Sequence, residues 1–543
     1  MPASQDVVII GGGHNGLVAA AYLARAGLST LVCENRDVVG GAAVSERPFG
    51  PDYTVTSLSY VVSLLPADLV RDLQLVKHGY HVYPQGPYFA PRADGRYLRL
   101  PHDPGERYAE IAKFSDHDAA AYDAYEAHMA GIGAILGPML SEIPPRLGSR
   151  RPADLLRQGL LLRHLKNVDT RAAVDITRLL SSSIADLLDD YFESDALRGL
   201  LSVSGVIGTW AGPRSAGSAY VTLHHHLGDS GGQAGAWGFP RGGMGGVTTA
   251  LAAAARSFGA EIRTGASVAR INTSGGRVTG VTLASGEDIA ARTVITTAHP
   301  RISFLELLDP AALPADFLAD IRGWHSRSGT VKINLAVDRL PVFASHPDFD
   351  PQVHGGTIVL AESLDDLEHA YQEAVAGQPS QVPFADICIP SVLDDSLAPV
   401  GQHVVSMFTQ WVPHSYADQS DEAALAAYAD RVIARMDTVA PGFASSILHR
   451  QVIGPRQMQE EYGLVGGNIF HGELTLGQMF HGRPAAGYAD LRTPLRGLYQ
   501  AGSATHGGGG VTGIPGRNVV HQVLADRRAA QWRRGGRKTL PPA

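Results

Sequence analysis

The segment between residues 6 and 34 constrains the fold more than any other part of the chain. An apolar run at 6–10 is followed by Gly-Gly-Gly-His-Asn-Gly, by a helix-patterned stretch that ends at Gly27, and by a second apolar run that ends at Glu34. Short apolar runs bounded by glycines are typical of buried strands. We therefore predict a β-α-β unit whose two strands lie parallel in one sheet.

The glycines of this unit match the pattern G-x-G-x-x-G. Gly11 allows the tight turn after the strand, Gly13 lets the backbone approach a pyrophosphate, and Gly16 permits close packing of helix and strand. His14 and Asn15 stand at the start of the helix, whose N–H groups and dipole attract phosphate. The pattern predicts a dinucleotide site.

Glu34 is the second mark of such a site. It follows Gly16 by 34 − 16 = 18 positions, close to the roughly 20 expected for the acidic residue that binds ribose hydroxyls. A carboxylate there would repel a 2′-phosphate, which argues against NADP. The motif alone does not separate NAD from FAD.

Two segments resemble flavoproteins of the amine oxidase and phytoene desaturase superfamily. Residues 34–41, Glu-Asn-Arg-Asp-Val-Val-Gly-Gly, are similar to the extension of the first motif in that superfamily. Residues 498–520 resemble the closing motif of the phytoene desaturase-related branch, with Ser503 where other flavoproteins carry an acidic residue. Amine oxidases often have Gly-Gly-Arg where this chain has Gly41-Ala42-Ala43, which argues against a close relationship with them.

The resemblance covers nearly the whole chain and implies non-covalently bound FAD. Val268 matches a strand valine whose backbone contacts the adenine, and residues of the closing motif match contacts to the ribityl chain, a phosphate and the flavin ring. The implied cofactor-binding residues are Gly11, Gly13, His14, Asn15, Gly16, Glu34, Asn35, Arg36, Gly40, Gly41, Ala42, Val268, Gly502, Gly510, Val511 and Thr512.

Lys332 and His506 are the catalytic candidates. Lys332 lies in an apolar strand pattern at 329–338, and in flavin amine oxidases a lysine on a comparable strand holds a water at flavin N5. His506 lies in the closing motif, where it would line the substrate end of the ring or transfer a proton. The alternatives are a strand lysine that faces outward and a loop histidine that binds backbone groups.

We expect no metal site. His224, His225 and His226 are consecutive, so on a helix their side chains diverge and do not converge on one ion. One of them is expected to face the substrate cavity. Cys33 and Cys388 are the two cysteines of the chain and lie in apolar runs, so we expect both in buried strands.

The length of 543 residues suggests two or three domains, and the net charge of −8 argues against nucleic acid as a partner. We predict an α/β fold. A Rossmann-like, three-layer FAD-binding domain with a parallel sheet is assembled from residues 1–70, 240–300 and 455–543. A mixed α+β substrate-binding domain is inserted as residues 71–239 and 301–454.

The resemblance implies a FAD-dependent oxidoreductase that desaturates or isomerises a carbon–carbon bond of an apolar, isoprenoid or carotenoid-like substrate. Hydride transfer to flavin N5 and loss of a proton would be followed by reoxidation by oxygen or a quinone. One alternative is a flavin amine oxidase that produces hydrogen peroxide. Another is a non-catalytic, FAD-bound interaction protein. The oligomeric state is left open.

The location follows from absences in the sequence. Neither a signal peptide nor an apolar run of about 18 residues is present, so we expect a cytoplasmic protein. The basic stretches 155–166 and 527–538 predict peripheral contact with the inner face of an anionic membrane. The alternative is a solvated helix face and a frayed tail.

Overall fold

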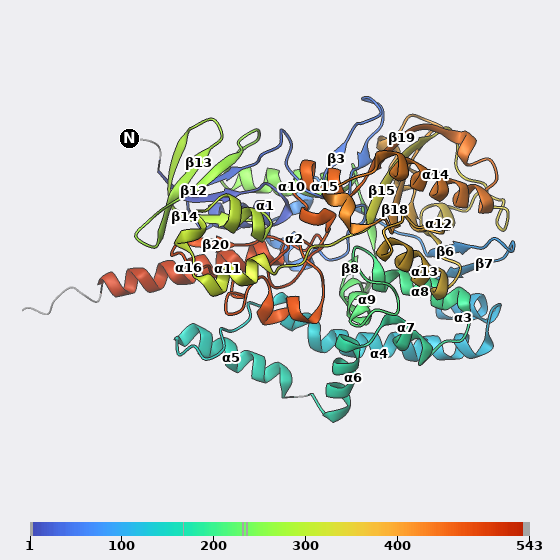
Figure 1. The fold of residues 1–543 in the computed structure, drawn as a ribbon, viewed down its shortest axis with the longest axis horizontal. Coiled ribbons are helices and arrows are strands. Elements are labelled where there is room, and N and C mark those ends of the chain that lie inside the picture. Colours follow the sequence, from blue (N-terminus) through green and yellow to red (C-terminus); the bar gives the residue numbers. More distant parts are fainter. Residues whose placement is uncertain (1–3, 167, 231–232, 235–236, 536–543) are drawn as a thin grey trace, which may run out of the picture.

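The computed structural model describes residues 4–166, 168–230, 233–234 and 237–535. Two lobes lie side by side, and each is built around a seven-stranded sheet (Figure 1). The chain passes between the lobes repeatedly, so both are assembled from separated segments. Within these ranges, no helix is both long enough and apolar enough to cross a bilayer.

The first lobe contains a parallel sheet that begins with the predicted β-α-β unit. β1 (Gln5–Ile10) pairs in parallel with β2 (Thr30–Cys33) on one side and with β14 (Asp288–Thr296) on the other. β11 (Glu261–Arg263) extends the sheet beyond β2, and β20 (Leu498–Gln500) extends it beyond β14. Three distant parts of the chain therefore supply strands that run in one direction.

Helices cover one face of this sheet. α1 (His14–Arg25), α10 (Met244–Ser257) and α16 (Ile514–Gly535) form that layer. Val7 and Ile9 of β1 pack in the same apolar cluster as these helices. Alternate residues of a strand point to opposite faces of its sheet. Val7 and Ile9 therefore both face this helical layer.

The opposite face carries the third layer. Its strands are β12 (Val268–Ser274) and β13 (Arg277–Leu283), an antiparallel pair that pairs in turn with β14. Val8 of β1 packs in the cluster that includes this pair. The predicted α/β fold, with a three-layer, Rossmann-like domain assembled from discontinuous segments, is confirmed.

Helix α11 (Ala315–Arg322) also packs on this third layer. Its residues Phe317 and Ile321 lie in the same apolar cluster as Val8. The predicted boundaries place α11 in the substrate-binding segment 301–454, and these boundaries stay a prediction.

The second lobe is built on a mixed sheet. β16 and β6 pair in parallel, and the other neighbouring strands pair antiparallel. The strand order is β19 (Ile447–Ile453), β15 (Thr330–Val337), β18 (His403–Gln410), β17 (Phe384–Cys388), β16 (Thr357–Leu360), β6 (Tyr88–Pro91) and β7 (Tyr97–Leu100).

The two faces of this sheet differ in chemistry. Val331 and Ile333 of β15, together with Met407 of β18, pack against α14 (Glu422–Val439). The residues between them point the other way, so Lys332 lies on the face opposite α14. That face carries the polar side chains of this lobe that matter for the site.

Helices of residues 104–226 pack beside the sheet, as the predicted inserted region requires. Four of these helices have a side-chain N-cap, which accepts a hydrogen bond from a backbone N–H of the first turn. The capping residues are Asp103, Ser115, Asp169 and Ser183. These helices are α3 (Pro104–Ala112), α4 (Asp116–Ser141), α5 (Pro152–Leu165), α6 (Thr170–Ser181), α7 (Ile184–Asp189), α8 (Asp195–Val206) and α9 (Ser218–His226).

Short elements complete the fold. The helices are α2 (Ala67–Asp72), α12 (Pro351–His354), α13 (Leu364–Val375) and α15 (Pro455–Tyr462), and the strands are β3 (Ser45–Glu46), β4 (Val55–Thr56), β5 (Val82–Pro84), β8 (Asp229–Ser230), β9 (Gln233–Ala234) and β10 (Gly238–Pro240).

Arg483 holds two loops of the C-terminal part together. Its guanidinium is almost fully buried and lies over the Trp324 ring. It donates hydrogen bonds to the backbone carbonyls of Phe470, Glu473, Gln478, Ser503 and Thr505. Burial lowers the pKa of Arg483 to about 10, so it stays charged at neutral pH.

Replacement of Arg483 should therefore destabilise the protein. In Arg483→Lys an ammonium with fewer N–H donors replaces the planar guanidinium. Some of the buried carbonyls then lose their hydrogen-bond partner, and we expect the free energy of unfolding to fall by about 3 kcal/mol. Thermal and denaturant unfolding measure the change, with the exposed Arg496→Lys as the matched control. An unfolding midpoint equal to that of the control would mean that Arg483 does not hold these loops together.

Candidate functional site

The loop between β1 and α1 depends on two glycines. Gly11 has φ of +100°, in the left-handed region that favours glycine. A Cβ atom at Gly16 would lie 2.1 Å from the carbonyl oxygen of Gly11. The helix thus begins against the loop at a distance that a larger residue would prevent, which is the geometry that the G-x-G-x-x-G pattern requires.

Glu34 ties the next loop to this turn. Its carboxylate accepts hydrogen bonds from the backbone N–H groups of Gly12, at 2.6 Å, and Arg36, at 2.9 Å. The N–H of Gly40 donates to the carbonyl of Gly12 at 2.9 Å. Residues 34–40 are therefore held beside the glycine loop.

The side chain of Arg36 is held by contacts with an acidic residue and an aromatic ring. Its guanidinium forms an ion pair with Glu46 and lies 4.6 Å from the centroid of the Tyr462 ring. Glu46 also accepts a hydrogen bond from the Tyr462 hydroxyl at 2.7 Å. These contacts fix the wall on which Arg36 lies.

The closing segment reaches the same place from the other end of the chain. A Cβ atom at Gly502 would lie 2.4 Å from the carbonyl oxygen of Thr297, and one at Gly516 would lie 2.2 Å from that of Asn15. The hydroxyl of Thr512 accepts a hydrogen bond from the N–H of Ile514, where α16 begins. The first turns of α1 and α16 therefore touch.

Two helix N-termini in contact make a favourable anion site, since each presents free N–H groups and the positive end of a dipole. Buried polar atoms are also present there: His14 Nε2 and Asn15 Oδ1 have no hydrogen-bond partner within the described residues. A dinucleotide with its diphosphate between the two helices fits this arrangement.

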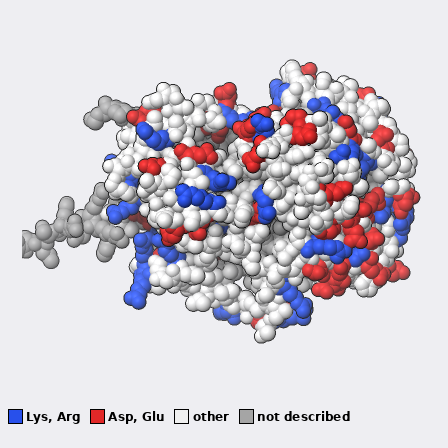
Figure 2. All heavy atoms as spheres, viewed as in Figure 1, with Lys and Arg blue, Asp and Glu red and all other residues white. Residues whose placement is uncertain are grey.

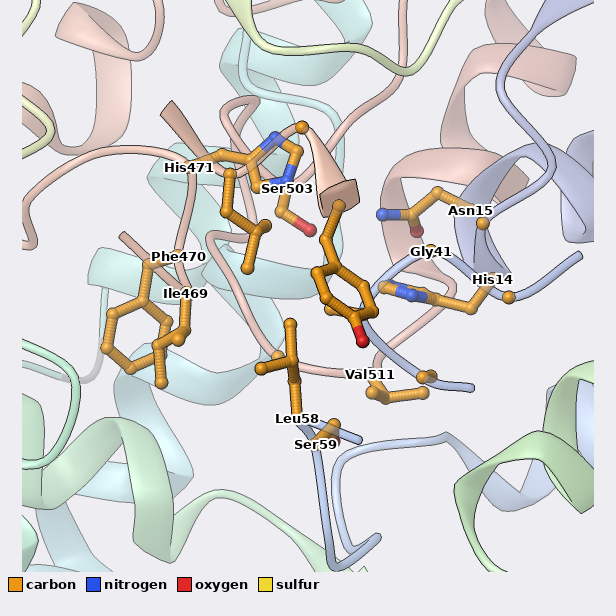
Figure 3. Close-up of a pocket in the computed structure, with 18 of the residues that line it drawn as sticks. His14, Asn15, Gly41, Leu58, Ser59, Ile469, Phe470, His471, Ser503 and Val511 are labelled. Carbon is orange, nitrogen blue, oxygen red and sulfur yellow. The ribbon is translucent and has the colours of Figure 1, made fainter. Parts of the chain in front are cut away.

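One cavity of about 490 Å³ joins these loops, a size in the range of small-molecule sites. Figure 3 shows His14 and Asn15 on one side of it and Ile469 and Phe470 across from them. The predicted cofactor-binding residues that line it are Gly11, Gly13, His14, Asn15, Glu34, Asn35, Arg36, Gly40, Gly41, Ala42, Val268, Gly510 and Val511.

The remaining predicted residues lie outside the cavity wall. Gly16 and Gly502 are packing positions, and Thr512 lies two residues before α16 and accepts a hydrogen bond from the N–H of Ile514. Lys332 and His506 are also outside the wall.

The far end of the cavity is formed by the sheet of the second lobe together with the segment after β4 that carries Tyr60. Tyr60, Tyr88 and Phe408 supply aromatic walls there, and Asp386 supplies a carboxyl. Sequence analysis missed these residues. The signal for Asp386 was a single carboxylate in the apolar run Phe-Ala-Asp-Ile-Cys, which is rare without a partner.

Lys332 is buried, so the alternative of an outward-facing lysine is wrong. Its ammonium donates to Ser406 Oγ at 2.7 Å, to the carbonyl of Thr56 at 3.3 Å and to Asn334 Oδ1. Burial lowers the pKa of Lys332 to about 7. The nitrogen lies 5.7 Å from the centroid of the Tyr60 ring, and Tyr60 itself lines the cavity.

His506 turns away from the cavity. Its Nε2 lies 2.9 Å from the carbonyl oxygen of Met139, and its ring lies near that of Phe480. Burial lowers the pKa of His506 to about 4, which keeps it neutral at pH 7. These contacts match the alternative, a loop histidine that binds backbone groups, and they do not support proton transfer to a substrate.

The three consecutive histidines of α9 diverge as expected. Their ring nitrogens lie near three different backbone carbonyls, those of Gly509 for His224, Ser204 for His225 and Thr222 for His226. Of the three, His225 lines the cavity. This arrangement gives no support to a metal site at the triplet.

The sequence is similar to a known protein family. A family model described as flavin-containing amine oxidoreductase matches residues 16–516. The chain is 40% identical to pyridine nucleotide-disulfide oxidoreductase domain-containing protein 2 of Rattus norvegicus, over 96% of this chain and 93% of that protein.

More distant relatives carry names that describe reactions. The chain is 27% identical to one of the subunits of a limonene dehydrogenase from Castellaniella defragrans, over 97% of this chain and 96% of that protein. It is 23% identical to a lycopene-forming phytoene desaturase of a Paracoccus strain, over 97% and 99%. The predicted relationship to the amine oxidase and phytoene desaturase superfamily is confirmed.

The fold is also similar to that of solved flavoenzymes. Cyclohexylamine oxidase from Brevibacterium oxydans superimposes with a TM-score of 0.59 at 18% identity, over 97% of this chain and 100% of that one. The residues in the cavity fit FAD, and FAD is the cofactor.

Substitution of Gly16 should weaken cofactor binding. In Gly16→Ala the new Cβ atom would lie 2.1 Å from a backbone oxygen of the loop, so α1 must move away from the diphosphate position. We expect the Kd for FAD to rise at least tenfold, a cost of about 1.4 kcal/mol. Flavin absorbance per chain after gel filtration measures retention.

Gly131→Ala is the matched control, because nothing lies within 4 Å of the added atom. It should retain as much FAD as the wild type. Equal retention by both variants would mean that the close approach of Gly16 to Gly11 has no part in cofactor binding.

Proposed function

The chain belongs to the family of flavin-containing amine oxidoreductases and is an FAD-dependent oxidoreductase, and we propose that it oxidises or isomerises a carbon–carbon bond of a largely apolar substrate. The observation that carries this proposal is the lining of the cavity beyond the cofactor loops. Leu58, Val62, Ile207 and Phe470 are among the apolar side chains there.

The relatives' names support the same reaction class. Limonene dehydrogenase and phytoene desaturase are named for the removal of hydrogen from limonene and from phytoene. When bound, FAD accepts a hydride from a C–H bond at N5 and passes the electrons to an acceptor, for which we propose oxygen or a quinone. An isoprenoid chain is accordingly the substrate class that we favour.

The protein's own part in this reaction is positioning and the exclusion of water. The apolar walls place a C–H bond against the cofactor and keep solvent from the reacting atoms. The three histidines that line the cavity, His14, His225 and His471, have pKa values lowered by burial to about 4, about 3 and about 4. They are neutral at pH 7 and can accept a hydrogen bond but hold no proton to donate as imidazolium.

Amine oxidation is the second candidate. Buried Lys332 favours it, because a lysine on a comparable strand serves flavin amine oxidases. The ammonium of Lys332 is bound by three protein oxygens and is not part of the cavity wall, and the Gly41-Ala42-Ala43 segment opposes this candidate. Hydrogen peroxide formed with amines but not with polyenes would decide for amine oxidation.

Lys332→Met tests the lysine in either reaction. The variant should retain FAD, since Lys332 is outside the cavity wall. Burial lowers the pKa of Lys332 to about 7, so the amine is partly protonated at neutral pH. Its loss should slow reoxidation of photoreduced flavin by oxygen about tenfold, because the charged form stabilises developing negative charge. Stopped-flow absorbance measures the rate.

Ser406→Ala is the control, since it removes one hydrogen bond of the lysine and leaves the amine in place. Its rate should stay within about twofold of the wild type, a difference of roughly 0.4 kcal/mol in the barrier. If Lys332→Met reoxidises as fast as this control, the lysine has no part in the mechanism.

We also propose that α5 rests on an anionic membrane surface. Figure 1 shows α5 projecting from the body of the molecule, and Figure 2 shows the charged side chains of the same face. The inner face of α5 is held by Asp154 and by Arg157, which donates to Gln522. The outer face exposes leucines, with Leu156 at 67% and Leu162 at 68% exposure.

A helix that packs on its own protein turns its apolar side chains inward and its polar side chains to solvent. In α5 the polar contacts lie on the inner face and the exposed leucines on the outer face. Basic side chains, among them Arg163 and Lys166, flank the exposed leucines and suit acidic lipid headgroups. A bilayer would be the source of an apolar substrate. The second basic stretch, 527–538, extends past residue 535 and its end lies outside the described residues.

Leu156→Glu with Leu162→Glu should abolish binding to phosphatidylglycerol vesicles in a sedimentation assay. The two glutamates remove apolar contact and repel acidic headgroups. Val342→Glu with Val400→Glu changes two exposed valines elsewhere and should leave binding intact. Sedimentation of the leucine variant at the wild-type level would overturn the proposal.

A further inference from the structure

Asp386 is the one carboxyl in a strand of apolar residues, and it faces the cavity. In β17, Ala385 and Ile387 pack in the cluster that contains α14, so Asp386 between them points to the opposite face. Its exposed fraction is 5%, and it lines the far end of the cavity.

The carboxyl of Asp386 is incompletely paired. Its Oδ1 atom has no hydrogen-bond partner within the described residues. The Tyr60 hydroxyl lies near the carboxyl and favours its charged form. Lys332 acts on it by charge alone, because the lysine ammonium is engaged with Thr56, Asn334 and Ser406.

A buried carboxyl oxygen without a partner costs free energy, on the order of 1–3 kcal/mol or more. Burial raises the pKa of Asp386 to about 7, which reflects the same cost. Such a group is retained in a fold when a ligand completes its hydrogen bonding. The position of Asp386 at the cavity end gives a ligand access to it.

The neighbours of Asp386 form a small polar patch inside aromatic walls. Tyr60 and Tyr88 carry hydroxyls there, and the Phe408 ring lies 6.0 Å from that of Tyr60. Gln85 donates one amide N–H to the Thr357 hydroxyl, and both residues also line the cavity. Asp386 supplies the carboxyl of this patch, and its Oδ1 is the strongest acceptor there without a partner in the described residues.

We propose that Asp386, with Tyr60 beside it, binds a hydrogen-bond-donating head group, a hydroxyl or a protonated amine, at one end of an otherwise apolar substrate. This inference rests on the proposed function and narrows its substrate class. A pure hydrocarbon would fill the apolar walls and leave the carboxyl unpaired, and sites built to bind a donor discriminate against analogues that lack it.

The test is a binding series on the FAD-loaded protein. Hexane, 1-hexanol, hexylamine and hexanoate are titrated separately, and binding is followed by the change in flavin absorbance. We expect 1-hexanol or hexylamine to bind at least tenfold more tightly than hexane and hexanoate. Equal binding of all four, or no binding of any up to its solubility, would overturn the inference.

Two variants identify the donor. Asp386→Leu should bind hexane more tightly than the wild type does and should show no preference for a head group. Asp386→Asn should still bind 1-hexanol if the head group is a hydroxyl, because the amide oxygen accepts a hydrogen bond. It should no longer bind hexylamine if the head group is an ammonium, because the negative charge is gone. Exposed Asp365→Asn is the control and should behave as the wild type. A preference that survives Asp386→Leu would assign it to another group.

The readout separates this inference from the proposed function. If no compound with an apolar chain reduces the flavin but the head-group preference persists, the proposed reaction fails and the binding site stands. If apolar compounds reduce the flavin and the preference is absent, the binding site fails and the reaction stands.

Discussion

The structure depends on the contact between the first turns of α1 and α16. A Cβ atom at Gly516 would lie 2.2 Å from the carbonyl oxygen of Asn15, so these helices meet at a distance that glycine alone allows. Two free N-termini side by side repel each other electrostatically, and an anion between them removes that penalty. The arrangement therefore stabilises the protein fully only with its cofactor bound, since a ligand that binds the folded state adds to its stability.

The rest of the site follows from how the two lobes share one cavity. The first lobe contributes backbone loops and few side chains, because a diphosphate needs N–H groups. The second lobe contributes one face of a sheet, where residues that alternate with the apolar core bring Asp386 and Phe408 to the cavity end and Lys332 close behind it. The two ends of the cavity are thus built from different parts of the fold.

The cofactor half of the site could be predicted from sequence, and the substrate half could not. Gly11, Gly16 and Glu34 act through spacing within one short unit, and such spacing is visible in a sequence. Asp386 and Tyr60 are 326 positions apart, as 386 − 60 gives, and only the tertiary fold brings them to the same cavity. Arg483 was missed for the same reason, and His506, which lies in a recognisable motif, turns its ring toward Met139.

A crystal structure of the protein with FAD tests the central claim most directly. The account predicts the diphosphate between the first turns of α1 and α16, the adenosine ribose at Glu34, and the flavin ring on the side of the cavity that leads to Tyr60 and Asp386. A diphosphate that touches α1 alone, or a flavin ring that points away from the second lobe, would contradict it.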